Sequence, residues 1–367
     1  MENNTTSQNI ESIILEESKI VITRDGSGKR IDINTTYLGA MKQIPVLLKG
    51  IYELMPNIDV YICAHKDLGD PININIIEKE LKSSKFYSET INLDKIHFRK
   101  YSTIGADLNI DFSVSILPTS KLASEKISYD LHKNPQTKIL YIWIDPLKFE
   151  PRKLLSEEEQ NALRKKYGID KNDYVIIGGS IATPEFQSFI EAIRFAKSSE
   201  AFSSKIIVPI VVPRTNIECE TMRFAATKIK SYNRSMWFGK KKWNDNIIFV
   251  EEKGVLADLY SIADIAFIGD TLIIEKSRGQ NPLEPAFYGK RIIAGNYHVN
   301  NSIAFNGLNK SGLLTYVNSE EELKREFAKI VPEAEMELYR KNASEFIKSE
   351  QGAAIKYAKK MQEIIYK

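Results

Sequence analysis

The segment Asn281-Pro282-Leu283-Glu284 has the residue types of a helix start that could also hold a phosphorylated ligand. Asparagine suits the N-cap, proline suits the first helical position, and Glu284 can accept a hydrogen bond from the N-cap amide. The free amides of a helix N-terminus attract phosphate, and a first-turn carboxylate can bind ribose hydroxyls. Taken alone, the segment favours an ordinary helix start over a binding site, so its surroundings have to decide.

Arg214 is a second candidate for anion binding, because Pro213-Arg214 directly follows the apolar run 205–212. A guanidinium at the C-terminal end of a strand can bind a phosphate or a carboxylate through two parallel N–H bonds. The alternative is a surface ion pair with Glu218 or Glu220.

Glycines occur near the same candidate residues. Gly254 opens a short predicted helix that leads into a strand ending at Gly269. Arg278, in the loop that follows, adds a positive charge. Gly178-Gly179-Ser180 come after the first strand of the same half, where glycine permits close backbone approach to a ligand, although a tight turn before a helix is the favoured explanation.

The elements that position these residues are strands alternating with helices in both halves of the chain, which indicates mostly parallel sheets covered on both faces. In such sheets ligands bind beyond the C-terminal strand ends, which is where the candidates are placed. The first half is predicted to begin with a β-hairpin formed by residues 20–23 and 30–34 around Asp25-Gly26-Ser27-Gly28. Further strands are predicted at 59–64, 110–117, 138–144, 174–177, 205–212, 247–250, 265–268 and 291–294. Helices are predicted at 38–54, 73–83, 120–131, 156–167, 184–198, 218–231, 255–262 and 282–288, with nearly all of 319–366 helical.

Size and composition fit a two-domain protein of 367 residues, with 43% hydrophobic and 27% charged residues. Two prolines between Asp145 and Arg152 favour a linker there, so the predicted domains are residues 1–150 and 151–367. The net charge of +3 is too small to indicate a nucleic-acid partner.

Cysteine usage and hydropathy favour a cytoplasmic protein without a metal. Cys63 and Cys219 have no Cys or His at metal-binding spacing and are interpreted as reduced, buried thiols. No apolar run reaches the roughly 20 residues needed to span a bilayer. Residues 1–8 are polar and lack the features of a signal peptide.

Several motifs occur in a fixed order along residues 170–300. They are Pro213-Arg214, the stretches 254–260 and 263–269, and Asn281-Pro282-Leu283-Glu284-Pro285-Ala286, followed by Gly289-Lys290 and Gly295. Together they resemble the C-terminal half of the 3-deoxy-D-manno-octulosonate (Kdo) transferases, which assemble the inner core of lipopolysaccharide. The resemblance implies an α/β protein of the GT-B fold, with two Rossmann-like doubly wound domains facing a cleft and a helical C-terminus.

The resemblance also implies an activity and a donor site. The function predicted from it is an inverting glycosyltransferase that builds a surface glycan or glycolipid. Residues 151–367 would bind a nucleotide-sugar donor, CMP-Kdo in that family, and residues 1–150 would bind a glycan or glycolipid acceptor. The predicted donor-binding residues are Arg214, Gly254, Gly269, Asn281 and Glu284. The donor is a substrate, and no separate cofactor is expected.

The first half departs from the family at the presumed general base. Tyr37-Leu38-Gly39-Ala40 stands where the family has Ser-x-Gly-Glu, so Ala40 replaces the catalytic glutamate. Alanine cannot take the proton of an acceptor hydroxyl, and loss of a base typically costs about 10²–10⁴-fold in rate. Asp25, His65 or Asp67 could serve instead, but a turn residue and a structural histidine are the favoured interpretations, so no catalytic residue is assigned.

Other functions and contacts therefore stay open. A catalytically silent protein derived from the GT-B fold would bind a sugar nucleotide without transferring it, and a nucleotide-sugar epimerase would share the architecture. His298 either lines the cleft or belongs to an ordinary loop. The basic run Gly239–Trp243 either contacts anionic lipid or a phosphorylated acceptor, or is a solvated loop, which leaves open a peripheral contact with the inner face of the membrane.

Overall fold

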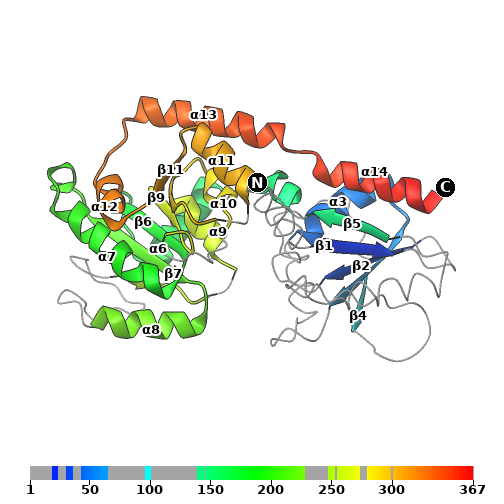
Figure 1. The fold of residues 1–367 in the computed structure, drawn as a ribbon, viewed down its shortest axis with the longest axis horizontal. Helices are drawn as coiled ribbons and strands as arrows, with labels where there is room; N and C mark the ends of the chain where they lie inside the picture. Colours follow the sequence, from blue (N-terminus) through cyan, green and yellow to red (C-terminus); the bar gives the residue numbers. More distant parts are fainter. Residues whose placement is uncertain are drawn as a thin grey trace, which may run out of the picture. The chain divides into compact units, whose positions relative to one another are not determined.

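The chain divides into two compact units in the computed structural model (Figure 1). Unit 1 contains Met1–Lys153 together with Glu350–Lys367, and unit 2 contains Leu154–Ser349. The sequence pattern assigns residues 350–367 to the second domain, whereas here they group with unit 1. The structure describes residues 19–23, 30–35, 43–64, 96–100, 139–143, 145–227, 247–252, 254–272, 279–298 and 301–366.

Unit 1 is built on a five-stranded sheet in the order β4-β3-β2-β1-β5. β1 pairs antiparallel with both β2 and β5, whereas β2, β3 and β4 pair in parallel. The pairing of β1 with β2 confirms the predicted hairpin. The sequence pattern does not predict β4, and the helices and strand predicted between residues 73 and 131 lie outside the described residues. The strands are β1 (Lys19–Thr23), β2 (Arg30–Thr35), β3 (Asp59–Ala64), β4 (Ile96–Lys100) and β5 (Ile139–Trp143).

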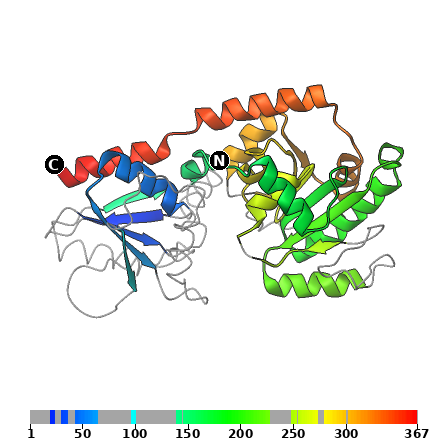
Figure 2. The same cartoon turned by 180° about the vertical axis from the view of Figure 1, so that it is seen from behind.

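Two helices from opposite ends of the chain pack together in unit 1 (Figure 1 and Figure 2). They are α3 (Ile44–Leu54), which is buried along most of its length, and α14 (Ala353–Tyr366). Gly50 allows the close contact, since a Cβ placed on it would lie 2.7 Å from the backbone oxygen of Ala354. A larger residue at this point of α3 would therefore push the two helices apart.

The N-terminus of α14 is capped by the carboxylate of Glu150, which lies near the end of the segment Met1–Lys153 of unit 1. Glu150 follows the short 3-10 helix η2 (Asp145–Phe149). Its Oε1 accepts hydrogen bonds from the amides of Gly352 and Ala354, at 2.8 and 3.1 Å. These amides belong to the first turn of a helix, where no intrahelical partner exists, so Glu150 acts as a cap for α14.

Unit 2 contains a six-stranded sheet in the order β11-β10-β9-β6-β7-β8, with parallel pairing throughout the described strands. Numbered from the first strand of the unit, this order is the 3-2-1-4-5-6 arrangement of doubly wound Rossmann domains. The topological switch point lies between β6 and β9, whose connections leave the sheet in opposite directions. The strands are β6 (Tyr174–Ile181), β7 (Ile207–Pro213), β8 (Ile248–Phe249), β9 (Ile265–Ile268), β10 (Arg291–Gly295) and β11 (Leu314–Val317).

The helices of unit 2 follow the predicted alternation. In space, α7 packs on α12, and α6 and α10 both contact the 3-10 helix η4 (Tyr260–Ile262). The sequence pattern does not predict α11 and β11, and α10 has only four residues where the pattern predicts 282–288. The helices are α6 (Glu157–Lys166), α7 (Thr183–Ser198), α8 (Asn216–Thr227), α9 (Leu256–Leu259), α10 (Leu283–Ala286), α11 (Ser302–Lys310), α12 (Glu320–Phe327) and α13 (Glu333–Ser349).

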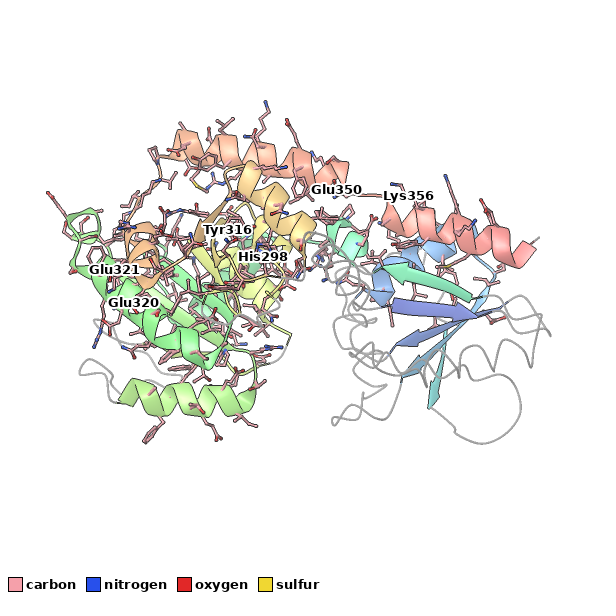
Figure 3. The ribbon with its side chains drawn as sticks, in the orientation of Figure 1. His298, Tyr316, Glu320, Glu321, Glu350 and Lys356 are labelled. Carbon is pink, nitrogen blue, oxygen red and sulfur yellow. The ribbon has the colours of Figure 1, made fainter. Side chains whose placement is uncertain are left out.

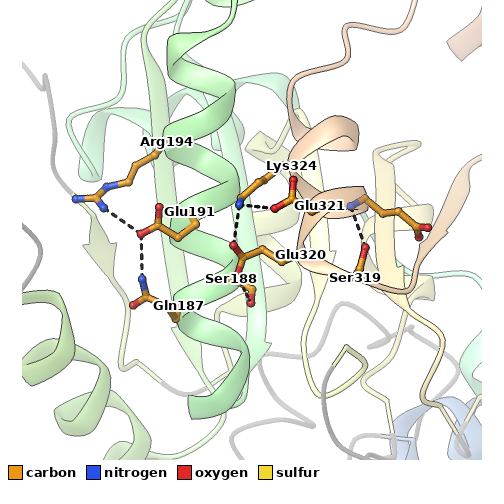
Figure 4. A network of polar contacts seen from close by, with 9 residues as sticks. Gln187, Ser188, Glu191, Arg194, Ser319, Glu320, Glu321 and Lys324 are labelled. Atoms are coloured by element: carbon orange, nitrogen blue, oxygen red, sulfur yellow. Dashed lines mark hydrogen bonds and ion pairs between the residues drawn. The ribbon is translucent and has the colours of Figure 1, made fainter.

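The contact between α7, α12 and the sheet has an aromatic centre and a polar rim. Phe189, Phe267 and Phe327 are fully buried, and their ring centroids lie 5.6–6.3 Å apart. At the rim, the hydroxyl of Ser188 donates to Glu320 at 2.9 Å, and Lys324 also bonds this carboxylate (Figure 4). These bonds lower the pKa of Glu320 below its ordinary value, with Lys324 as the larger cause. The core therefore fixes α7, which carries a residue of the site described next.

Candidate functional site

The ends of β6 and β9 meet at the switch point with an unusual backbone. The amide of Gly269 donates to the carbonyl of Gly179 at 2.9 Å. Ser180 and Asp270, the next residue on each side, have φ angles of 53° and 60°, in the left-handed region that non-glycine residues seldom adopt. A Cβ on Gly269 would lie 2.4 Å from the carbonyl oxygen of Ser180. Strained residues of this kind often occur at functional sites, and these two lie where doubly wound sheets bind ligands.

Glu284 lies close to this junction through Tyr260. A Cβ on Gly179 would lie 1.8 Å from the hydroxyl oxygen of Tyr260, so this buried ring covers the end of β6. The pKa of Tyr260 is raised well above its ordinary value, first by burial and then by the negative charge of Glu284. α10 contacts η4, which contains Tyr260, so α10 and the end of β6 both lie beside this residue.

Arg214 joins the same region from the end of β7. Its Nη1 lies 2.9 Å from Oδ2 of Asp270, forming an ion pair between strand ends that are not neighbours. The side chain of Arg214 is 47% exposed, whereas that of Asp270 is only 4% exposed. The sequence-based alternative, pairing with Glu218 or Glu220, is not what the structure has, because Glu218 bonds the hydroxyl of Thr215 instead. The exposed part of the guanidinium is available to an anion from solvent.

Glu185, a fully buried residue in the first turn of α7, holds the loop after β9. Its Oε2 accepts the amides of Ala182 and Asp270, at 3.1 and 2.6 Å. Its Oε1 accepts the amides of Thr271 and Leu272, at 2.7 and 2.6 Å. Burial raises the pKa of Glu185, and the four amide bonds oppose that shift. One carboxylate thus fixes three consecutive residues at the switch point.

Thr271 ties this loop to β10 as well. Its hydroxyl donates to the carbonyl of Ile268 at 2.6 Å and accepts the amide of Gly295 at 2.8 Å. Its own carbonyl accepts the amide of Tyr297 at 2.9 Å. The C-terminal ends of β9 and β10 are therefore connected by hydrogen bonds through Thr271, and Gly269 connects β9 to β6.

Asn281 acts within its own loop. Its side-chain oxygen accepts the amide of Leu283 at 3.1 Å, and Pro282 is the N-cap of α10. The predicted assignment of Asn281 as N-cap is therefore displaced by one residue. A helix of one turn has few aligned peptide dipoles, so the attraction of phosphate to its N-terminus is weaker than the predicted helix 282–288 implies. The side chains around α10 matter more than its dipole.

His298 follows β10 and is stacked on aromatic rings. Its imidazole is nearly parallel to the rings of Phe305 and Tyr316, with centroid separations of 4.2 and 5.3 Å. His298 and Tyr316 are labelled in Figure 3. Burial lowers its pKa below the ordinary value. Its Nδ1 is buried without a hydrogen-bond partner among the described residues. Gly279, with φ of 72°, lies against it, because a Cβ there would be 2.8 Å from Cβ of His298.

The predicted donor-binding residues separate into two groups. Arg214, Gly269, Asn281 and Glu284 lie at or near the carboxyl edge of the sheet in unit 2. Gly254 is exposed, has a φ of 88° and precedes α9, which accounts for a glycine without a ligand. Arg278, Asp25, Ala40, His65, Asp67 and the run 239–243 lie outside the described residues.

Sequence reasoning missed Glu185, Asp270, Thr271 and Tyr260. The only signal for Glu185 is its place three residues after Ala182, the N-cap of α7, where the pattern assigns the cap to Thr183. Among the described residues, no group of three or more His, Cys, Asp or Glu side chains could hold a metal ion. No helix in this part of the chain is long and apolar enough to cross a membrane.

Two curated proteins resemble part of the chain, which matches no protein-family profile. A bifunctional glycosyltransferase/methyltransferase of Fusobacterium nucleatum is 33% identical over an alignment of 156 positions, which covers 38% of this chain and 22% of that protein. The 3-deoxy-D-manno-octulosonic acid transferase of Aquifex aeolicus is 31% identical over 162 residues, 44% of this chain and 42% of that protein. The chain is a distant relative of the Kdo transferases. The resemblance expected from the sequence motifs is thereby confirmed.

The chain covers less than half of the length of either curated relative, so the relatives' activities do not transfer directly to this chain. A solved glycosyltransferase of Rickettsia africae matches 91% of this chain and 97% of its own, with a TM-score of 0.55 and 13% identity. Identity this low shows a shared fold alone. The predicted α/β fold with a parallel sheet is confirmed. The Rickettsia africae protein, which shares the fold, is a glycosyltransferase. The arrangement of two domains facing a cleft stays a prediction.

Proposed function

We propose that the chain is an inverting glycosyltransferase that takes a nucleotide-activated sugar as donor. The observation that carries this proposal is the half-exposed guanidinium of Arg214, held by Asp270 at the switch point of a Rossmann-type sheet, in a distant relative of the Kdo transferases. A nucleotide sugar needs both a cation for phosphate and a carboxylate for ribose hydroxyls. The similarity to the Kdo transferases favours a CMP-linked keto-acid sugar as the donor, and unit 2 as the domain that binds it.

Each residue of the proposed site has a chemical role. Arg214 binds the donor phosphate with the exposed part of its guanidinium, which among the described residues is bonded through Nη1 to Asp270. Glu284 accepts the ribose hydroxyls. Asn281 shapes the loop before α10 through its bond to the amide of Leu283. The acceptor, a glycan or glycolipid, is assigned to unit 1, whose residues 1–153 include the predicted acceptor domain.

The general base is not assigned. Two described carboxylates are buried at the switch point, and neither suits the role. Both oxygens of Glu185 accept amides, and Asp270 is paired with Arg214. Ala40 stands where related sequences are expected to carry a glutamate. This substitution favours a second candidate function, a protein that binds the sugar nucleotide without transferring it.

Calorimetry with CMP, UDP and their sugar conjugates tests donor binding. We expect Arg214→Ala to weaken the binding of the preferred nucleotide by about 10–100-fold, the usual cost of a lost charged hydrogen bond. Glu284→Ala should weaken a nucleoside more than it weakens inorganic phosphate. Arg194→Ala is the matched control, since this arginine pairs with Glu191 on α7 in the same unit. Unchanged affinity in both Arg214 and Glu284 variants would show that the donor site is elsewhere.

Transfer is tested separately from binding. The protein is incubated with CMP-linked donor and a panel of lipid and oligosaccharide acceptors, and release of CMP is followed. Release that depends on the acceptor supports the glycosyltransferase. Tight donor binding without acceptor-dependent release supports the silent binding protein, and the absence of any nucleotide binding contradicts both.

A further inference from the structure

The backbone amides of residues 270–272, in the loop after β9, donate hydrogen bonds within the protein. Three successive amides, those of Asp270, Thr271 and Leu272, point at one carboxylate, Glu185. A row of consecutive N–H groups of this kind is a common cradle for phosphate. Here the cradle is filled by a side chain that is 0% exposed. These three amides are not available to a phosphate, so a phosphate beside this loop needs other donors, among them the guanidinium of Arg214.

The same carboxylate fixes the backbone that carries the partner of Arg214. Asp270 has φ of 60°, a strained conformation for a non-glycine residue that persists only when its surroundings enforce it. Glu185 enforces it by accepting the amide of Asp270 at 2.6 Å and the next two amides. The carbonyl of Asp270 is held too, by the amide of Gly279 at 3.1 Å. Asp270 thus has one available backbone conformation, from which its carboxylate reaches Arg214.

The ion pair leaves Arg214 oriented but still accessible. Only Nη1 of the guanidinium contacts Asp270 among the described residues, and the side chain remains 47% exposed. An arginine has five N–H donors in a rigid plane, so a bond at one nitrogen fixes the direction of the others. An arginine without this partner would lose its rotamer freedom only when the ligand binds, and that entropic cost would weaken the binding.

We propose that Glu185 and Asp270 are positioning residues for Arg214: Glu185 fixes the loop, Asp270 aims the guanidinium, and the guanidinium binds the phosphate of the ligand. This inference rests on the proposed role of Arg214 in donor binding. It adds that the anion affinity of the site is set from inside unit 2, by a residue on α7 that never touches the ligand.

A double-mutant cycle separates positioning from general stability. In the parent protein, Asp270→Ala should weaken CMP binding by about 10-fold, because Arg214 loses its orienting partner. In the Arg214→Ala background the same substitution should change CMP binding by less than about twofold, since no guanidinium is left to orient. Asp270→Asn keeps a neutral acceptor and should give an intermediate loss. Equal effects in both backgrounds would overturn the proposal.

Two further variants control for loss of structure. Asp173 is also buried in unit 2, where its carboxylate accepts the amide of Asp170 at 2.8 Å. Asp173→Asn should lower the melting temperature while leaving CMP affinity unchanged. Glu185→Gln should speed hydrogen exchange at the amides of residues 270–272, because its NH₂ group faces donors, and should also weaken CMP binding. Unchanged exchange at those amides would show that Glu185 does not fix the loop.

Inorganic phosphate as a second probe distinguishes this inference from the proposed function. One outcome is that phosphate binding shows coupling between Arg214 and Asp270 while no nucleotide binds. That result would reject the nucleotide-sugar function and support the positioning of Arg214 by Asp270. Nucleotide binding with an uncoupled cycle would support the function and reject the positioning. Binding of neither probe would reject both.

Discussion

His298 shows how a single titratable side chain can be kept neutral by its packing. Its ring stacks on Phe305 and Tyr316, and its Nδ1 is enclosed without a described partner. Burial favours the uncharged form, which is why its pKa is lowered. The imidazole therefore behaves as an aromatic ring that becomes destabilising once it is protonated.

The stability of unit 2 should depend on pH through this residue. Because the folded-state pKa of His298 lies below the unfolded one, the unfolded chain binds the proton first as the pH falls. We expect the contribution of His298 to the free energy of unfolding to be constant above about pH 7. It should fall as the pH drops through about 6.5 toward the folded pKa, by up to about 1.4 kcal/mol per pH unit. Denaturation monitored by hydrogen exchange in β10 measures it.

The matched variants are His298→Phe and Tyr316→Phe. The first keeps a ring in the stack and removes the titrating group, so it should abolish this part of the pH dependence. The second keeps the imidazole and should retain it. A slope that survives in His298→Phe would assign the pH dependence to another residue.

Residue-level predictions from sequence depend on local patterns, and the donor-binding roles of Arg214 and Glu284 stay predictions. Arg214 and Glu284 were recognisable because each follows a predicted strand or opens a predicted helix. Asp270 was not, because its partner Arg214 is 56 positions away and no local pattern connects them. Glu185 bonds amides 85–87 positions away for the same reason. Hydrogen bonds and ion pairs between residues that are far apart in the sequence cannot be predicted from a short local motif.

At the scale of elements, the strand ends of unit 2 converge with no room for a side chain. A Cβ on Gly295, the last residue of β10, would lie 2.0 Å from the carbonyl oxygen of Thr271 and 2.4 Å from Cα of Leu272. These are backbone atoms, so relief requires a shift of the loop held by Glu185. The close approach of β10 to this loop is therefore part of the construction of the candidate site.

Gly295→Ala should separate β10 from that loop. We expect a loss of about 1–3 kcal/mol in the free energy of unfolding of unit 2, together with weaker nucleotide binding. Gly168→Ala is the control, because φ there is 67° but nothing lies within 4 Å of the added Cβ, so only the backbone strain is felt. Thermal unfolding and calorimetry measure both effects; a Gly295 variant no less stable than the Gly168 variant would contradict the crowding.

Elements with strong periodicity were predictable, and those shaped by tertiary contacts were not. The apolar run 265–268 is β9 with the same bounds. The sequence pattern misses α11, whose Gly307 lowers helix propensity. The structure explains that glycine, since a Cβ there would lie 2.0 Å from the ring of Phe346 on α13. Packing of one helix on another outweighs propensity at this position.

At the scale of the whole molecule, one unit is contiguous in sequence and the other is not. Unit 2 is a single segment, Leu154–Ser349, whereas unit 1 combines Met1–Lys153 with Glu350–Lys367. The sequence predicted a two-part chain with a linker near residues 145–152. It placed the last helix in the second domain, because α14 is an amphipathic helix that either unit could accept and nothing in its sequence points to unit 1.

Gly50→Val tests the attachment of α14 to unit 1. The added Cβ would lie 2.7 Å from the backbone of Ala354, so we expect faster hydrogen exchange in both α3 and α14, with a loss of about 1–3 kcal/mol in unit 1. Lys49→Ala, an exposed position on the same helix, should leave exchange unchanged. Loss of protection in β6 and β9 of unit 2, with α3 unaffected, would contradict the assignment.

The bond between Glu150 and the amides of Gly352 and Ala354 has a consequence for synthesis on the ribosome. A chain emerging from its N-terminus presents all of unit 2 before α14 has been translated. Unit 2 can therefore fold while unit 1 still exposes the face of α3 that α14 will cover, and that face is the part most open to aggregation or chaperone binding in the nascent chain. Unit 1, which contains the first residues to be translated, is therefore the unit that finishes folding last.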